Sequence, residues 1–393
     1  MLLTNAMLYA PEPLGPGSIL VKGARIAAIG ERLAGHPAPG VESVDLGGAA
    51  LGPGLIDLHA HGADGVELMD GGDAITRMAR FVARHGVTGF LPATVTASWE
   101  ATERAIDGVR RAIAVKAEPA KGARVLGVHL EGPFLSPERL GAQSPEHCIP
   151  PTPASVARLI DLVRGIPCIV TLAPEVEGGM DAVRALVEAG AVVSLGHSVA
   201  SAEETEAAFA AGATQVTHLF NGMPPMHHRE PGLVGAALTA GGVRVELIAD
   251  GVHVHPTAVR LAIAAKGVDG ALLVTDSMAA TGCVDGEYVL GPMKVIVKDG
   301  EARLASGALA GSTLTLERAV WNVARWTGGP SGSPSVQSLG GAWQMASLNP
   351  ARQLGLDDHM GRLAPGYDAD LTAMDGDGNV VLTMVGGEIV YRR

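Results

Sequence analysis

Eight short apolar runs alternate with helical patterns through the middle of this chain, and this alternation limits the possible fold more than any other feature. The runs cover residues 55–61, 87–92, 125–131, 168–173, 191–197, 215–218, 243–250 and 271–276. Runs that are apolar on both faces, alternating with helices, are typical of a parallel sheet covered by helices. A count of eight favours a closed (β/α)8 barrel, whose active site lies at the carboxyl ends of its strands. A doubly wound open sheet is the competing arrangement.

Helical spacing fills most of the intervals between these runs. In the first interval, Ile75, Met78, Ala79 and Val82 recur at the spacing of one helix face. Similar patterns occur at residues 99–115, 154–164, 180–189, 201–211, 256–266 and 313–326. The stretch 327–338 is rich in Gly, Ser and Pro, which predicts a loop near the end of the barrel.

The two ends of the chain have the sequence pattern of short strands separated by turns. Predicted strands lie at residues 18–21, 25–29, 370–374, 380–385 and 388–391. Neither end is long enough to bury a sheet alone, so we predict one small β-sandwich domain assembled from both termini. Its two parts are residues 1–52 and 356–393, and the barrel at 53–355 is inserted between them.

Composition and charge exclude several classes of protein. Of the 393 residues, 47% are hydrophobic, and the net charge is -12, which argues against binding nucleic acid or anionic membranes. No apolar stretch approaches the roughly 20 residues that span a bilayer, and the amino terminus lacks the basic flank of a targeting segment. Cys148, Cys168 and Cys283 show no paired spacing, which favours a reducing compartment. We therefore expect a soluble cytoplasmic protein.

Most of the predicted strands end in a residue that can bind metal or carry a proton. These residues are His59, His61, Glu131, His197, His218, Asp250 and Asp276. Because the carboxyl ends of barrel strands meet at one mouth, the set predicts a shared metal centre rather than scattered core residues. Nitrogen and carboxylate ligands suit zinc or iron(II). A carboxylate beside such a metal can move a proton, and Asp276 is the predicted one.

Several sequence motifs carry a specific family resemblance. They are PGLIDLHAHG at 53–62, HLEGPF at 129–134, LGHS at 195–198, THLFNGMP at 217–224, REPG at 229–232, ADGVH at 249–253, VTD at 274–276 and LAGS at 309–312. The first resembles the opening motif of the amidohydrolase superfamily, and together they resemble the N-acetylglucosamine-6-phosphate deacetylases of that superfamily. The similarity runs through nearly the whole chain in the same order. It implies an amidohydrolase-type barrel that uses one or two ions of zinc or iron(II) per subunit.

The resemblance also implies roles for individual residues. Glu131, His197 and His218 match the family's metal ligands, and Asp276 matches its catalytic carboxylate. His59 and His61, which some members lack, make a second metal plausible. Related barrels often bridge two metals with a lysine after strand four; none stands at 169–175 here, so Glu131 is the expected bridge. The implied substrate-binding residues are Ala142, Gln143, Asn221, Gly222, Arg229, His253, Leu309, Ala310 and Gly311.

The family arginine can reach across from a neighbouring subunit, so Arg229 implies a homodimer. One departure is Gln143, where the family often carries histidine. Glutamine can hydrogen-bond but cannot carry a proton at neutral pH. The change should matter little if two metals polarise the carbonyl of the substrate; otherwise it affects the identity of the substrate or the rate of the reaction.

The implied reaction is hydrolysis of the acetamide of N-acetyl-D-glucosamine 6-phosphate, in amino-sugar catabolism or cell-wall recycling. The alternatives are the same chemistry on N-acetylgalactosamine 6-phosphate or another amide, and a catalytically silent barrel that serves as a binding protein.

Overall fold

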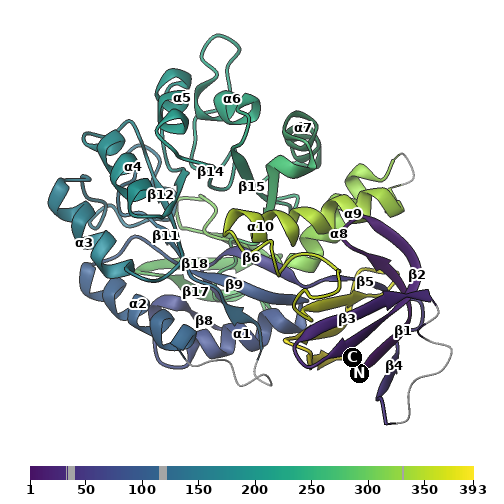
Figure 1. The fold of residues 1–393 in the computed structure, drawn as a ribbon. Helices are drawn as coiled ribbons and strands as arrows, with labels where there is room; N and C mark the ends of the chain where they lie inside the picture. Colours follow the sequence, from purple (N-terminus) through teal and green to yellow (C-terminus); the bar gives the residue numbers. More distant parts are fainter. Residues whose placement is uncertain (32, 34–39, 115–121, 330–331) are drawn as a thin grey trace.

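The computed structural model describes residues 1–393 except 32, 34–39, 115–121 and 330–331. Figure 1 shows a large barrel with helices around its outside and, next to it, a smaller β domain that holds both chain termini. The predicted (β/α)8 barrel with a small β domain from both ends is therefore confirmed.

Eight parallel strands form the barrel wall. They are β6 (Leu55–Ala60), β9 (Val87–Thr94), β11 (Val128–Glu131), β12 (Cys168–Leu172), β13 (Val192–Leu195), β14 (Gln215–Val216), β15 (Arg244–Ile248) and β16 (Ala271–Val274), and a short strand, β10 (Arg124–Val125), also pairs with β9. The ring is completed between β6 and the segment after β16. There the backbone N–H of Asp276 donates to the carbonyl of His59, and that of His61 donates to Ser277, at 2.8 Å each. This closure brings the first and last strand ends to the same mouth.

Helices cover the outside of the barrel. They are α1 (Ala74–Arg84), α2 (Trp99–Ala114), α3 (Pro153–Val163), α4 (Gly179–Glu188), α5 (Ala202–Ala210), α6 (Gly232–Thr239), α7 (Pro256–Lys266), α8 (Leu316–Thr327), α9 (Val336–Met345) and α10 (Leu348–Gln353), with short 3-10 turns η2 (Leu68–Asp70) and η4 (Val268–Gly270). The seven predicted helices are present within a few residues, although residue 115 lies outside the described residues. Capping residues explain where helices α3 and α5 begin. Pro153 follows the capping Thr152, and Ser201 and Glu204 form a capping box.

The sequence did not predict α6, α9 and α10. The predicted loop at 327–338 is shorter than expected, because Ser335 caps α9 and the helix begins at Val336. Residues 330 and 331 of that stretch lie outside the described residues. Helix α6 is apolar nearly all round, so it lacks the one-sided periodicity that identifies a surface helix.

The small domain is an eight-stranded sheet made from both ends of the chain. Its strands are β1 (Leu2–Tyr9), β2 (Pro13–Lys22), β3 (Arg25–Gly30), β4 (Ser43–Asp45), β5 (Ala50–Pro53), β20 (Leu371–Met374), β21 (Val380–Val385) and β22 (Glu388–Arg392). The antiparallel pairing of β5 with β20 joins the N-terminal and C-terminal parts. Leu3, Ile19, Leu51 and Leu371 have no exposed surface and form its separate apolar core.

Trp343 of α9 connects the two parts of the molecule. Its buried indole N–H donates to the carbonyl of Pro53 at 2.8 Å, at the junction of β5 and β6. The ring also stacks on Tyr9 of β1, with centroids 5.8 Å apart. This contact fixes the start of β6, the strand that carries His59 and His61 toward the mouth.

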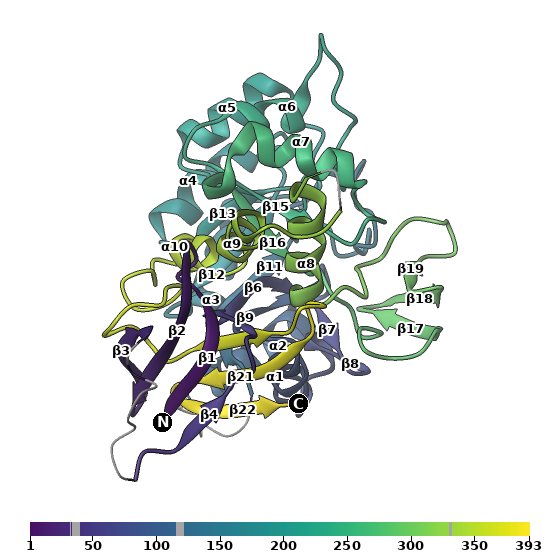
Figure 2. The ribbon, with the colours of Figure 1, turned by 90° about the vertical axis from the view of Figure 1, so that its right-hand side faces the viewer.

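A three-stranded antiparallel sheet is inserted after β16. It consists of β17 (Gly286–Leu290), β18 (Met293–Lys298) and β19 (Glu301–Arg303), and Figure 2 shows it standing out from the side of the barrel. A small two-stranded ribbon, β7 (Gly62–Ala63) with β8 (Val66–Glu67), follows β6. Within the described residues, no helix combines the length and apolar character needed to cross a membrane.

Candidate metal centre and active site

Three of the predicted site residues leave their strands through an unusual backbone conformation. His197, His218 and Asp276 have φ of 49°, 29° and 50°, shortly after β13, β14 and β16. Residues other than glycine rarely adopt this left-handed region, and such strain tends to persist at functional sites. Next to Glu131, Gly132 is equally constrained, because a Cβ there would lie 2.1 Å from Oγ1 of Thr96.

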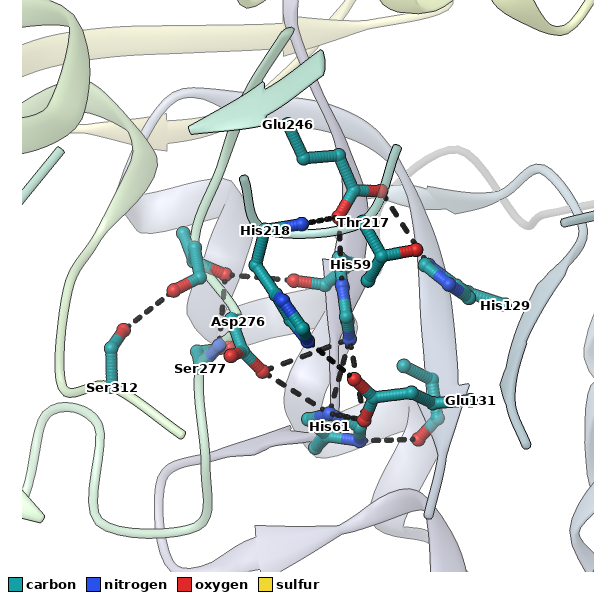
Figure 3. Close-up of polar contacts among 12 residues, drawn as sticks. His59, His61, His129, Glu131, Thr217, His218, Glu246, Asp276, Ser277 and Ser312 are labelled. Atoms are coloured by element: carbon teal, nitrogen blue, oxygen red, sulfur yellow. Dashed lines mark hydrogen bonds and ion pairs between the residues drawn. The ribbon is translucent and has the colours of Figure 1, made fainter. Parts of the chain in front are cut away.

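The carboxylate of Glu131 lies between two pairs of histidines, as Figure 3 shows for three of the four rings. Its Oε1 is 2.9 Å from Nε2 of both His197 and His218, and these two nitrogens are 3.1 Å apart. Its Oε2 is 3.2 Å from Nε2 of His61. All five side chains are nearly or fully buried. The geometry therefore brings together the five predicted ligands, with Glu131 in the middle.

Asp276 joins the second pair. Nε2 of His59 and Nε2 of His61 are 3.1 Å apart, and Oδ1 of Asp276 is 3.2 Å from the latter. A tetrahedral metal with bonds of about 2.0 Å keeps its ligand atoms about 3.3 Å apart. Two groups, Glu131–His197–His218 and His59–His61–Asp276, match that spacing.

The hydrogen bonds of the histidine rings show which nitrogen of each ring faces the centre with a lone pair. Nδ1 of His61, His197 and His218 lies 3.2, 2.7 and 3.1 Å from the backbone carbonyls of Ala93, Arg139 and Asn221. A carbonyl only accepts, so each Nδ1 carries the hydrogen and each Nε2 of the neutral ring presents a lone pair. Lone pairs of nitrogen and carboxylate oxygen repel one another at this spacing unless a proton or a metal ion lies between them. The residues thus fit a divalent metal.

The carboxylates and imidazoles of the site shift the pKa values of one another. Burial acts to raise the pKa of Glu131, but the neighbouring imidazoles, led by His197, hold it well below its usual range. Burial likewise acts against ionisation of Asp276, yet His59 and His61 lower its pKa. In the opposite direction, burial acts to lower the pKa of His61, but Asp276 and Glu131 raise it to about 9.

Asp250, which the sequence grouped with the metal ligands, lies elsewhere. Its Oδ2 accepts the Nδ1 hydrogen of His253 at 2.6 Å, and its Oδ1 accepts the backbone N–H groups of Val252 and His253 at 2.8 Å each. It belongs to neither of the two ligand groups. The prediction was wrong because the carboxylate of Asp250 stabilises its own turn and accepts from His253, whereas His197, His218 and Asp276, which also lie two residues beyond their strands, belong to the two ligand groups.

The sequence missed Glu246, a buried carboxylate within β15. Its Oε2 lies 3.1 Å from Nδ1 of His59, and its Oε1 accepts from Gln215 at 2.6 Å. A single charged residue between Val245 and Leu247 in an apolar strand was the available signal. His129 is buried nearby and hydrogen-bonds to Leu58 and Thr171, and burial lowers its pKa to about 3.

A pocket of about 800 Å³ of open space lies over the candidate metal centre. Seven of the nine predicted substrate-binding residues line it, namely Ala142, Gln143, Asn221, Gly222, His253, Leu309 and Gly311. Ala310 is fully buried behind the lining, and Arg229 lies exposed on the loop before α6, where its Nη1 is 2.8 Å from Nε2 of His228. Within the described part of the chain, neither lysine nor arginine lines this pocket.

Gln143 contacts the centre directly. Its side-chain oxygen accepts the backbone N–H of Thr96 at 2.7 Å, and its amide nitrogen donates to Oε2 of Glu131. The residue therefore orients the carboxylate of Glu131 by hydrogen bonding.

The inserted sheet supplies part of the pocket that the sequence did not predict. Leu290, at the end of β17, lines it together with Ala308. The next residue, Gly291, donates its backbone N–H to both oxygens of Glu67 at 2.9 and 3.0 Å. Glu67 is buried, so this contact anchors the hairpin tip to the ribbon after β6.

Comparison with known proteins agrees with the fold. Residues 50–390 match the amidohydrolase family model. The chain is 40% identical to an N-acetylglucosamine-6-phosphate deacetylase of Vibrio furnissii over 89% of this chain and 85% of that protein. It is 41% identical to an N-acetylgalactosamine-6-phosphate deacetylase of Escherichia coli O157:H7 over 86% and 87%. A mutant N-acetyl-D-glucosamine-6-phosphate deacetylase from Mycobacterium smegmatis, solved with N-acetyl-D-glucosamine 6-phosphate, superposes with a TM-score of 0.89, 38% identity and 99% coverage of both chains. The chain therefore belongs to the amidohydrolase family.

Proposed function

We propose that this chain hydrolyses the acetamide of N-acetyl-D-glucosamine 6-phosphate to acetate and D-glucosamine 6-phosphate. The observation that carries the proposal is the convergence of two histidine pairs and Asp276 on Glu131 beneath an open pocket. The named activity of the Vibrio furnissii relative and the substrate in the Mycobacterium smegmatis structure support this choice of substrate.

The metal is proposed to be zinc or iron(II), with two ions per subunit and Glu131 between them. The mixed imidazole and carboxylate ligands support these metals over calcium or magnesium, which prefer oxygen. A bound divalent ion supplies Lewis acidity, which polarises an amide carbonyl and makes water a nucleophile at neutral pH.

Asp276 is the proposed proton carrier. His59 and His61 lower its pKa against the effect of burial, so it is ionised at neutral pH and able to accept a proton. In the proposed reaction it takes the proton from the attacking water and delivers it to the amine nitrogen as the C–N bond breaks. Its Oδ1 is 3.2 Å from Nε2 of His61, within the centre itself.

The sugar phosphate is proposed to bind through His253, Asn221, the backbone of Gly222, and Arg229. His253 lines the pocket, and its hydrogen bond to the carboxylate of Asp250 fixes the position of the ring there. Arg229 lies exposed on the loop before α6, a region that projects from the molecule in Figures 1 and 2. Since the pocket lining described above has no lysine or arginine, we propose a homodimer in which Arg229 enters the neighbouring pocket. The three free cysteines support a cytoplasmic site of action.

A second candidate substrate is N-acetylgalactosamine 6-phosphate. The Escherichia coli O157:H7 relative that bears this name is as similar to the chain as the N-acetylglucosamine enzyme is. The two sugars differ only in the orientation of one hydroxyl group, so the lining of the pocket decides between them.

The deciding experiment is an acetate-release assay on both epimeric sugar phosphates, with enzyme of measured metal content. Release from the N-acetylglucosamine compound at the higher kcat/KM supports the proposal, and the reverse order assigns the second candidate. Unphosphorylated N-acetylglucosamine is the control, because its hydrolysis does not use the phosphate contacts. No release from either sugar phosphate by the metal-loaded protein would reject the function and favour the catalytically silent barrel.

A further inference from the structure

Glu246 is a carboxylate with no exposed surface, held inside the barrel beside the candidate metal centre. Figure 3 shows it next to His59 and His218, on the far side of those rings from Glu131. An ionised group in such surroundings is unfavourable unless neighbouring donors replace its lost hydration. The presence of this carboxylate in an apolar strand therefore indicates a specific role for Glu246.

Three N–H groups surround this carboxylate. Oε2 lies 3.1 Å from Nδ1 of His59 and accepts the backbone N–H of His218 at 3.1 Å. Oε1 accepts the side-chain amide of Gln215 at 2.6 Å. The other atom of that amide, Oε1 of Gln215, is buried without a partner. The side-chain oxygen of Gln215 therefore has no hydrogen bond, while its amide nitrogen orients the carboxylate of Glu246.

The same region is not a third metal site, although His59, His129 and Glu246 are close enough to form one. Nδ1 of His129 lies 3.0 Å from the carbonyl of Leu58, so it carries a hydrogen and has no lone pair to offer. Its distance of 3.9 Å from Glu246 is also long for a hydrogen bond. The remaining contact, from His59 to Glu246, is a donor–acceptor pair.

His59 differs from the other three histidines of the centre in this contact. Nδ1 of His61, His197 and His218 faces a backbone carbonyl, whereas Nδ1 of His59 faces a carboxylate. A carboxylate behind a metal-ligating histidine fixes the ring and its tautomer and makes the other nitrogen a better ligand.

We propose that Glu246 is a positioning residue that makes His59 a metal ligand and thereby determines whether the His59–His61–Asp276 group holds an ion. This inference rests on the proposed metal centre. The rings of His197 and His218 keep their hydrogen bonds to backbone carbonyls, and a glutamine at 246 can still accept the backbone N–H of His218 through its amide oxygen, so Glu246→Gln should weaken one ion and spare the other.

The test is metal retention in Glu246→Gln, measured by elemental analysis after dialysis against zinc buffers of graded free concentration. Wild-type protein should hold two ions. The variant should hold one as tightly as wild type and bind the second about 10- to 100-fold more weakly. His59→Ala marks the loss of that same ion, and Glu246→Gln combined with His59→Ala should be no weaker than His59→Ala alone.

Glu317→Gln is the matched control, because the buried carboxylate of Glu317 pairs with the partly exposed His85 outside the centre, at 2.8 Å. It should retain both ions. Gln215→Leu removes only the support of Glu246 and should weaken the same ion about fivefold, which keeps the idea testable should Glu246→Gln not fold.

Three results would overturn the inference: unchanged retention of both ions in Glu246→Gln and Gln215→Leu, loss of both ions together, or a single ion in the wild type. Acetate release by the wild type is scored separately. A protein that loses one ion selectively but never releases acetate would reject the proposed function and leave this inference standing.

Discussion

Oδ1 of Asp276 lies 3.2 Å from Nε2 of His61. The side chain proposed for proton transfer is therefore also within one of the two groups that could hold a metal ion. Any substitution of Asp276 changes both proton transfer and metal binding, so the activity of the variant has to be interpreted together with its metal content.

We expect Asp276→Asn to lower kcat by about 10²- to 10⁴-fold, because the amide cannot accept and return a proton. The ion at Glu131, His197 and His218 should remain, since Asp276 is not in that group. Steady-state kinetics on the sugar phosphate, paired with elemental analysis, measures both effects. Full activity with unchanged metal content would remove Asp276 from the mechanism.

Removal of metal should lower stability as well as abolish activity. A ligand that binds only the folded state stabilises it by about 2.7 kcal/mol at 100 times its Kd. Chelated protein should therefore melt at a lower temperature and recover its melting point and activity with zinc or iron(II). Magnesium serves as the control, because the nitrogen-rich ligand set suits it poorly. A melting temperature that does not respond to chelation and zinc would contradict a structural contribution of the ions.

Gln143→Leu should destabilise the protein by about 1–3 kcal/mol, since it leaves the buried N–H of Thr96 without its acceptor. It also frees Oε2 of Glu131, so metal affinity should fall. Denaturant unfolding and zinc titration measure the two effects. Equal stability of Gln143→Leu and wild type would show that the Thr96 contact contributes nothing.

Asp250→Asn should raise KM for the phosphorylated sugar about tenfold and leave kcat nearly unchanged. The reason is that His253 loses its hydrogen bond to a carboxylate, the contact that holds the ring in place for the phosphate. Hydrolysis of the unphosphorylated sugar is the internal control and should not respond. A fall in kcat for both sugars would instead point to a distorted pocket.

Stability should depend on pH through Glu67. Burial raises its pKa to about 7, from about 4.5 in an unfolded chain. Between these pH values the folded protein binds the proton and the unfolded chain does not, so this group lowers stability as pH rises from about 4.5 to 7. The shift corresponds to roughly 3 kcal/mol.

Glu67→Gln removes this titration, while its oxygen can still accept from Gly291. The variant should therefore gain stability relative to wild type as pH rises through that window. Urea unfolding at pH 4.5, 6 and 8, at equal metal loading, measures the difference. A difference that stays constant with pH would refute the assignment.

The strands and most helices of the barrel were predictable because they follow local rules. Apolar runs such as those leading to His59 and Glu131 must be buried, and amphipathic segments such as α1 carry the period of a helix. Helix α6 and the inserted β17–β19 sheet were not predicted. The first is apolar all round, and the second is stabilised by contacts such as Glu67 with Gly291, which are 224 residues apart.

By itself, the sequence determined which residues end the strands, and hence that His59, His61, Glu131, His197, His218 and Asp276 would meet at one mouth. That follows from chain geometry alone, since parallel barrel strands place their carboxyl ends together. Only the tertiary structure decided that Asp250 accepts from His253 and that Glu246 contacts His59. Those relationships depend on side-chain directions and on the closure of β6 against the segment after β16, and distances of 3 Å between remote residues are set by packing, which no local pattern encodes.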